Sequence, residues 1–410
     1  MLFRNLLRHV VREGTVHLID AKGRSFSFGD GRQPRCTLRL HSRLLDFKIP
    51  LVPSLYFGEA YMDGLMTFEE GSLGDFLRIV MQNNGRLNTH WLVRLGWAIK
   101  RQTSRVNRYN PIGKARRNVA HHYDLSDRLY ELFLDPDRQY SCAYFTSPHG
   151  DLTQAQEDKK RHIAAKLLLD RPGLKVLDVG SGWGGLGLYL CEASSCDVTG
   201  ITLSSEQLAV SQDRARRAGL DQRVRFRLED YRRSRGVYDR IVSVGMFEHV
   251  GSKSYDEFFG QVRDLLADDG IGLVHSICYS GAPGPDNPFI TKYIFPGGHI
   301  PSLSEVIPAV ERSGLLITDV EILRLHYAET LRIWHDRFQA NRDQIAELYD
   351  ERFCRMWEFY LKGCEMSFRH HNLMVVQIQL AKKLQSVPLT RDYITEWERA
   401  DREQRAHAAE

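Results

Sequence analysis

Apolar and polar residues alternate along the chain in two different ways, and the change falls near residue 119. Beyond it, short apolar runs are separated by segments of ordinary helical length. The predicted strands cover 174–180, 196–202, 223–228, 238–245 and 271–278, and the predicted helices cover 152–169, a segment from Trp183, 205–218 and 254–267. Strands that alternate with helices form a mostly parallel sheet with helices on both faces, so this part is predicted to have an α/β fold.

The residues before about 107 have a different pattern, which is typical of a smaller mixed α+β domain. Residues 15–50 predict short strands, and residues 58–72 predict a glycine-containing turn region before a helix that begins near Leu73. The segment 91–101 predicts a basic amphipathic helix with two tryptophans. This composition suits a helix at a lipid interface and equally a helix packed on its own domain.

A chain of 410 residues is long enough for two hydrophobic cores. We expect one domain over 1–107, a linker over 108–118 and a second domain over 119–410. No window approaches the ~20 apolar residues that a membrane-spanning helix needs, and residues 1–14 lack the unbroken apolar stretch of a secretory signal. Seven scattered cysteines, an odd number, indicate free thiols. The expected location is the cytosol.

The net charge of +4 conceals a strong asymmetry. Residues 1–117 contain 20 Lys and Arg against 9 Asp and Glu, whereas the remainder contains 36 against 43. Between Asp75 and Asp124 there is no acidic residue, but there are ten basic ones. A surface of one sign attracts a polyanion, which is either a nucleic acid or an anionic bilayer. A solvated helix face is the simpler alternative.

The clearest motif lies at the end of the predicted strand 174–180. Gly180, Gly182 and Gly185 form G-x-G-x-x-G, whose glycines allow a tight turn and close approach of a ligand to the backbone. Dinucleotide enzymes use the same pattern, but their second strand ends in an acidic residue that binds the ribose. Here the second strand ends in 200–204, GITLS, without one. The pattern therefore favours S-adenosylmethionine over a dinucleotide, with Asp178 ordering the loop or accepting a hydrogen bond.

Two further polar loops follow the third and fourth predicted strands. Glu229, Asp230 and Tyr231 follow the third, where a contact to an adenine ring would lie, and residues 244–250, VGMFEHV, follow the fourth. Because open α/β sheets bind ligands at the carboxyl ends of their strands, these loops are expected around the same site as the glycines.

Several segments together resemble the cyclopropane-fatty-acyl-phospholipid synthases, a family related to the mycolic acid cyclopropane synthases. The matching segments are GEAYMDG (58–64), HHYDLSDRLYELFLD (121–135), YSCAYF (140–145), LDVGSGWGG (177–185), GITLSSEQ (200–207), YDRIVSVGMFEHVG (238–251) and IFPGG (294–298). The resemblance covers essentially the whole chain. It implies a Rossmann-like class I methyltransferase domain with a mostly parallel seven-stranded sheet, preceded by an N-terminal lipid-binding domain.

The resemblance also implies the reaction. The methyl group of S-adenosylmethionine is added across a cis double bond of an acyl chain in a membrane phospholipid, and a proton is then lost to a bound bicarbonate ion as a cyclopropane ring closes. Such a site should exclude water, which would otherwise capture the carbocation. The enzyme would be a homodimer that binds no nucleic acid and contacts the anionic inner face of the cytoplasmic membrane through its basic N-terminal region, with 91–101 as a candidate contact.

The family's site residues transfer to specific positions of this sequence. The implied cofactor-binding residues are Tyr140, Ser141, Asp178, Gly180, Gly182, Thr202, Gln207, Asp230 and Tyr231. The implied bicarbonate shell consists of Cys142, Glu248, His275, Tyr327 and the backbone of Ile277, with Glu248 accepting the hydroxyl of the ion. No metal site is expected, because His121, His122 and His249 lack a regular ligand spacing.

Two alternatives remain open from the sequence. A methyl-branching enzyme of the same family would lose the proton differently and leave an alkene. A nucleic-acid methyltransferase would account for the basic N-terminal third, although no base-flipping or RNA-binding motif is present.

Overall fold

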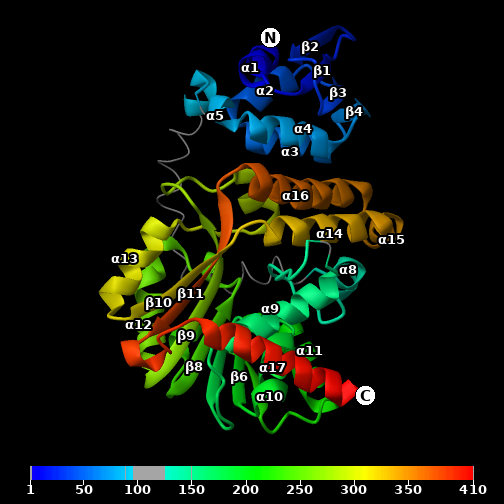
Figure 1. Cartoon of the computed structure of the whole chain (residues 1–410). Coiled ribbons are helices and arrows are strands. Elements are labelled where there is room, and N and C mark those ends of the chain that lie inside the picture. Colours follow the sequence, from blue (N-terminus) through cyan, green and yellow to red (C-terminus); the bar gives the residue numbers. More distant parts are fainter. Residues whose placement is uncertain (1, 88, 96–124, 149, 410) are drawn as a thin grey trace. The chain divides into compact units, whose positions relative to one another are not determined.

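The structure, a computed structural model, describes residues 2–87, 89–95, 125–148 and 150–409 (Figure 1). The chain divides into two compact units, which are described separately. The N-terminal unit comprises residues 1–107, 284–296 and 328–373, and the α/β unit comprises 108–283, 297–327 and 374–410. This division differs from the expected domains 1–107 and 119–410, because two later segments pack with the N-terminal residues. The expected linker, 108–118, lies outside the described residues.

A seven-stranded sheet forms the centre of the α/β unit, with the strand order β10-β11-β9-β8-β5-β6-β7 (Figure 1). Its strands are β5 (Lys175–Val179), β6 (Asp197–Thr202), β7 (Val224–Leu228), β8 (Tyr238–Val244), β9 (Leu266–Tyr279), β10 (Leu316–Leu323) and β11 (Leu373–Ala381). The neighbours from β9 to β7 are parallel, whereas β10 and β11 pair antiparallel. The predicted mostly parallel seven-stranded sheet is confirmed.

Successive side chains of β5 enter two different hydrophobic cores. Val176 packs in a core with helices on one face of the sheet, and Leu177 packs in a second core with helices on the other. The first face carries α9 (Leu152–Lys166), α10 (Gly185–Ser194), α11 (Ser205–Arg217) and α17 (Asp392–Ala409), and the second carries α12 (Tyr255–Leu265) and α13 (Leu303–Ser313). Because side chains alternate along a strand, apolar residues at consecutive positions of β5 bury both faces.

The polar C-terminal residues fold into α17 and do not form a tail. Asp401 accepts hydrogen bonds from Arg161 Nε at 2.8 Å and from the Tyr189 hydroxyl at 2.9 Å. Glu398 lies 2.7 Å from Nδ1 of His162. These contacts attach α17 to α9 and α10, so its charged residues are part of the packing.

The N-terminal unit contains a four-stranded sheet in the order β2-β1-β3-β4. Its strands are β1 (Thr15–Ile19), β2 (Ser25–Gly29), β3 (Arg35–Leu40) and β4 (Met66–Glu70), and its N-terminal helices are α1 (Leu2–Val10), α2 (Leu45–Leu51), α3 (Pro53–Met62), α4 (Leu73–Gln82) and α5 (Asn84–Leu87). The strand expectation for residues 15–50 is wrong after Leu40, where α2 forms. The turn region expected over 58–72 is instead the end of α3 followed by β4.

The later helices of the N-terminal unit are α14 (His326–Ala340), which belongs to this unit from Ala328 onward, α15 (Arg342–Leu348) and α16 (Glu351–His370). Phe359 and Met366 of α16 belong to the same hydrophobic core as the N-terminal helices, together with Phe289. A Cβ atom at Gly58 of α3 would lie 2.5 Å from the Phe289 ring. This close approach explains why the segments around Phe289 and Phe359 fold with the N-terminal residues.

Among the described residues, every helix is too short or too polar to cross a membrane. All seven cysteines are unpaired, as the odd count indicated. The expected helix 91–101 lies mostly outside the described residues, but 91–95 are helical, with 66% of Trp91 and 52% of Leu95 exposed.

Candidate active site

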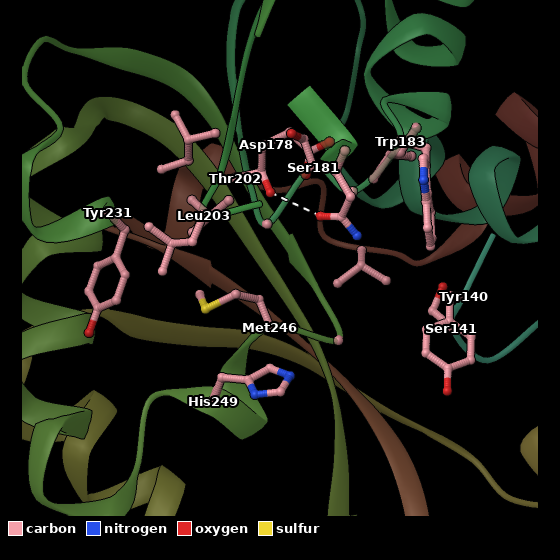
Figure 2. A pocket seen from close by; sticks show the side chains of 18 of the residues that line it. Tyr140, Ser141, Asp178, Ser181, Trp183, Thr202, Leu203, Tyr231, Met246 and His249 are labelled. Carbon is pink, nitrogen blue, oxygen red and sulfur yellow. Dashed lines mark hydrogen bonds between the residues drawn. The ribbon is translucent and has the colours of Figure 1, made fainter. Parts of the chain in front are cut away.

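A pocket opens at the carboxyl ends of β5, β6 and β8 and contains about 1180 Å3 of empty space, its open mouth included. All nine predicted cofactor residues line it: Tyr140, Ser141, Asp178, Gly180, Gly182, Thr202, Gln207, Asp230 and Tyr231. Figure 2 shows Tyr231 on one side and Tyr140 on the other, with Asp178 and Thr202 at one edge. Segments that are far apart in the sequence thus meet in one pocket at the carboxyl edge of the sheet, where open α/β sheets bind ligands.

The glycine turn after β5 requires its glycines for different reasons. Gly180, Gly182 and Gly184 have φ angles of 86°, 54° and 85°, a left-handed conformation that other residues rarely adopt. A Cβ at Gly180 would lie 2.7 Å from Met246, and a Cβ at Gly185 would lie 2.4 Å from the carboxylate of Asp137. At Gly182 the same atom would meet open space. The turn therefore faces the cavity at Gly182 and contacts neighbouring loops at its two ends.

The loop after β6 is held by hydrogen bonds among its own side chains. The Thr202 Oγ1 donates to Oε1 of Gln207 at 3.0 Å, and the backbone N–H of Gln207 donates to Oγ of Ser204, the N-cap of α11 (Figure 2). Both Thr202 and Gln207 are buried. The amide nitrogen of Gln207 keeps two donors, which suits hydroxyl groups of a ribose.

The loop after β7 carries the two residues expected near adenine. Asp230 is buried, and Arg232 donates to it from Nε at 2.8 Å and from Nη2 at 2.7 Å. The ring of Tyr231 packs edge-on against Phe258, with centroids 5.3 Å apart. The carboxylate of Asp230 is therefore occupied by hydrogen bonds within its own loop, whereas Tyr231 presents an aromatic face that a flat base can contact.

The segment before α9 forms the wall on the side of Tyr140. The ring of Tyr140 lies 5.4 Å from that of Tyr130 in α8 (Asp127–Phe133). Lys159 of α9 donates from Nζ to Ser141 Oγ at 2.8 Å and to Gln139 Oε1 at 2.6 Å. A fully buried lysine thus fixes the segment that contains Tyr140, Ser141 and Cys142.

Comparison with known proteins connects this pocket to a family. Residues 112–378 match the family model described as mycolic acid cyclopropane synthetase. The chain is 37% identical over 335 residues to the cyclopropane-fatty-acyl-phospholipid synthase of Escherichia coli K12. The matched region covers 81% of this chain and 84% of that enzyme. It is 34% identical over 398 residues to the tuberculostearic acid methyltransferase of Mycobacterium tuberculosis, covering 92% and 90%.

The chain belongs to the mycolic acid cyclopropane synthetase family. The solved structure of the cyclopropane synthase CmaA1 complexed with S-adenosylhomocysteine is 36% identical, with a TM-score of 0.62, and covers 66% of this chain and 99% of that one. The protein is therefore an S-adenosylmethionine-dependent methyltransferase with a Rossmann-like fold. The preference for S-adenosylmethionine over a dinucleotide, inferred from the missing acidic residue after β6, is confirmed.

The five residues implied as the family's bicarbonate shell lie outside the lining of the cofactor pocket. Glu248 stands in a short 3-10 helix (Phe247–His249) between Met246 and His249, both of which do line it. Glu248 Oε1 accepts the backbone N–H of Ile277 at 2.6 Å, while Oε2 is buried without a hydrogen-bond partner. Burial raises the pKa of Glu248 to about 7. The Ile277 N–H, expected to face the ion, is used to orient Glu248.

His275 lies two residues before Ile277 on β9 and is buried. Burial lowers its pKa to about 3, so the imidazole is neutral at physiological pH. The side-chain amide of Gln377 lies 3.2 Å from Nδ1 of His275. Because this amide nitrogen can only donate, Nδ1 accepts and the proton resides on Nε2, where it can be donated to an anion.

Cys142 and Tyr327 occupy separate segments. Cys142 is buried, its Sγ donates to the Ala143 carbonyl at 3.3 Å, and burial raises the pKa of the thiol. A protonated, buried thiol is a poor nucleophile, which agrees with a purely structural role. Tyr327 is buried in the first turn of α14, next to His326, whose Nδ1 accepts the backbone N–H of Phe145 at 2.9 Å.

Three residues of the site were missed by sequence analysis. Lys159 and Gln139 line the pocket, and Gln377 contacts His275. Lys159 lies within a charged run that is typical of a solvated helix face, and Gln377 lies in a strand whose pairing the sequence does not reveal. Met246 and His249 also line the pocket, and both belong to the loop 244–250 that was expected there because it follows β8.

The buried carboxyl of Asp178 predicts a measurable pH dependence of stability. Burial raises its pKa from the ordinary value of 3.8 to about 7. Between these values the folded state retains a proton that the unfolded state has lost, so this residue contributes less stability as the pH rises, by at most about 1.4 kcal/mol per pH unit. Urea unfolding of the ligand-free protein at pH 5 and pH 7.5 measures how much free energy of unfolding is lost as the pH rises. This loss should be smaller for Asp178→Asn than for the wild type. Equal losses would contradict the assignment.

Proposed function

We propose that this protein is a cyclopropane-fatty-acyl-phospholipid synthase, which transfers a methylene group from S-adenosylmethionine to the cis double bond of an acyl chain in a membrane phospholipid. The observation that carries the proposal is the pair formed by Glu248 and Ile277 directly beside the cofactor pocket, with one carboxylate oxygen buried and unpartnered. The Escherichia coli enzyme of that name, matched over most of both chains, supports the substrate class.

The residues present suit a bound bicarbonate ion. Glu248 Oε2 can accept one hydroxyl hydrogen bond, and the Nε2 proton of neutral His275 can be donated. The resemblance to the family adds Tyr327 to the proposed shell. When bound, bicarbonate supplies the base for the final proton loss. The chain itself would orient that group and exclude water, because a carbocation exposed to water becomes an alcohol. An alkene needs no base to become a nucleophile, so the chain needs no general base before the methyl group is transferred.

Product analysis tests the reaction directly. Purified protein, S-adenosylmethionine and vesicles of a cis-unsaturated phospholipid should give acyl chains heavier by one CH2 that resist catalytic hydrogenation, and added bicarbonate should raise the yield. A product of the same mass that takes up hydrogen would contradict ring closure. It would instead favour a methyl-branching activity, which the similarity to tuberculostearic acid methyltransferase keeps as the second candidate.

Glu248→Gln should fold and bind S-adenosylhomocysteine normally but lose turnover by about 100-fold or more, because an amide cannot accept as a carboxylate does. The wild-type rate should increase with pH through about 7, where burial places the pKa of Glu248. Glu257→Gln, an exposed residue of α12, is the matched control and should leave the rate unchanged. Turnover of Glu248→Gln within threefold of the wild type would remove this residue from the site.

We also propose that the N-terminal unit contacts the anionic inner face of the cytoplasmic membrane. Leu44, the N-cap residue of α2, and Phe47 and Leu51 within the helix recur at helical spacing and are 63%, 57% and 46% exposed. The exposed basic residues Arg43 and Lys48 lie beside them. Apolar side chains flanked by cations suit an interfacial helix, since the cations attract anionic headgroups and the apolar side chains enter the bilayer.

Replacing Leu44 and Phe47 by serine should weaken flotation with vesicles that contain anionic phospholipid by about tenfold, while turnover on detergent-dispersed lipid changes little. Leu389→Ser, at a fully exposed leucine of the α/β unit, is the matched control and should have no effect on flotation. Unchanged flotation of the double variant, or binding to oligonucleotides in preference to vesicles, would count against the membrane contact.

A further inference from the structure

His162 lies where three elements of the α/β unit meet, and both of its ring nitrogens contact carboxylates. It belongs to α9 and is buried. Its Nδ1 lies 2.7 Å from Oε1 of Glu398 in α17, and its Nε2 lies 2.8 Å from Oε2 of Glu321 in β10. Because an ionised carboxylate can only accept hydrogen bonds, both ring nitrogens must donate, and a ring with two N–H groups is an imidazolium. His162 is therefore a buried cation that attaches β10 and α17 to α9 (Figure 1).

The groups around the ring favour this protonated state. Burial lowers the pKa of His162, but the hydrogen bonds to Glu321 and Glu398 outweigh burial and raise the pKa above its ordinary value of 6.5. The charge is thus present at neutral pH and is lost only as the pH rises through this higher value. The titratable and charged groups that face the ring, or face its carboxylate partners, are Lys166 from α9, Glu321 from β10, Glu398 and Arg402 from α17, His275 from β9, and Tyr144, His326 and Arg391 from adjoining segments.

The ring of Tyr144 is stacked between His162 and His326. The ring centroids lie 4.2 Å from His162 and 5.0 Å from His326, and the planes are within 7° and 5° of parallel. His326 is the neutral member of the stack, because its Nδ1 accepts the backbone N–H of Phe145 at 2.9 Å. A cation over an aromatic face is attracted by the electrons of the ring. The charge of His162 therefore holds Tyr144 from one side, while His326 supports it from the other.

Tyr144 ends the segment that forms one wall of the cofactor pocket. Tyr140 and Ser141 of this segment line the pocket, whereas His162 does not. The backbone N–H of Tyr144 donates to the carbonyl of Ala155 in α9 at 3.0 Å. Since the backbone on both sides of the Tyr144 ring is bonded to α9 or to His326, a displaced ring would shift the wall that contains Tyr140.

We propose that His162 is a positioning residue of this methyltransferase, which as an imidazolium bound to Glu321 and Glu398 fixes Tyr144 and thereby holds the pocket wall in the position that binds the cofactor. The C-terminal helix α17 is then required for cofactor binding, although it contributes no residue to the pocket lining. The inference goes beyond the proposed function, because it concerns the cofactor and holds for any acyl substrate or product.

Two measurements on the full chain between pH 6 and pH 9.5 test the proposal. Nitrogen-15 NMR follows the ring of His162, and calorimetry follows the affinity for S-adenosylhomocysteine. In the wild type the affinity should fall about 2- to 10-fold as the ring loses its second proton, the range that the loss of one ring contact gives. Lys159, whose burial lowers its pKa to about 8, titrates in the same range. The test therefore compares midpoints between variants that all retain Lys159.

Glu398→Gln removes one of the two negative charges that retain the proton on His162. It should move the midpoints of both measurements to lower pH by about one unit. Glu396→Gln, the same change at an exposed residue of α17, is the matched control and should leave both midpoints where they are. Equal midpoints in these two variants would overturn the proposal.

Replacing Tyr144 tests the stack itself. Tyr144→Leu removes the ring and should weaken binding of S-adenosylhomocysteine at pH 7 about 2- to 10-fold, whereas Tyr144→Phe retains the ring and should restore the wild-type affinity. Wild-type binding by Tyr144→Leu, or an equal loss in both variants, would overturn the proposal.

Two further results keep the proposal separate from folding and from the reaction. A neutron crystal structure of the wild type at pH 7 needs no variant, and a single hydrogen on the His162 ring would overturn the proposal. Normal binding of S-adenosylhomocysteine without a cyclopropane product would contradict the proposed function and leave the role of His162 intact.

Discussion

The site depends on the backbone path between Gly180 and Gly185, where Gly180, Gly182 and Gly184 adopt a left-handed conformation at alternate positions. Glycine at these positions permits the path, and the turn contacts Met246 at one end and Asp137 at the other. The loop after β8 and the segment before α9 are thereby held against the same turn. Since the glycine turn faces open space at Gly182, the two loops define a cavity around it.

The second constraint is the unusual burial of charge in α9. Arg161 pairs with Asp401 and Lys160 with Asp137, so a run that would ordinarily face solvent forms the packing between α9, α17 and the pocket wall. Each of these charges has a partner, which offsets its loss of hydration. Lys159 donates hydrogen bonds to Gln139 and Ser141 and so connects the packing of α9 to the wall of the pocket.

Much of the α/β unit could be predicted from sequence because its apolar strands and glycine turn are local signals. Seven of the nine cofactor residues meet in one pocket because parallel strands end at the same edge. Tyr140 and Ser141 come from the segment before α9. Other features depend on tertiary contacts. The helix at Leu45–Leu51 replaces an expected strand, and α17 is attached to α9 by the contacts of Asp401 with Arg161 and of Glu398 with His162. Residues 328–373 pack with the N-terminal unit because Phe359 lies against Gly58. The pattern of apolar residues along the sequence gives no sign of this long-range contact.

The same distinction applies to the reaction. Glu248 could be located by its place after β8, but its orientation by Ile277 and the tautomer of His275 set by Gln377 are properties of the folded chain. The central claim is that S-adenosylmethionine binds in the pocket at the glycine turn. A crystal structure with S-adenosylhomocysteine tests it most directly. We predict the adenine beside Tyr231, the ribose at Gln207 and the amino-acid end toward Tyr140 and Ser141. A ligand bound in the opposite direction, or outside this pocket, would contradict the account.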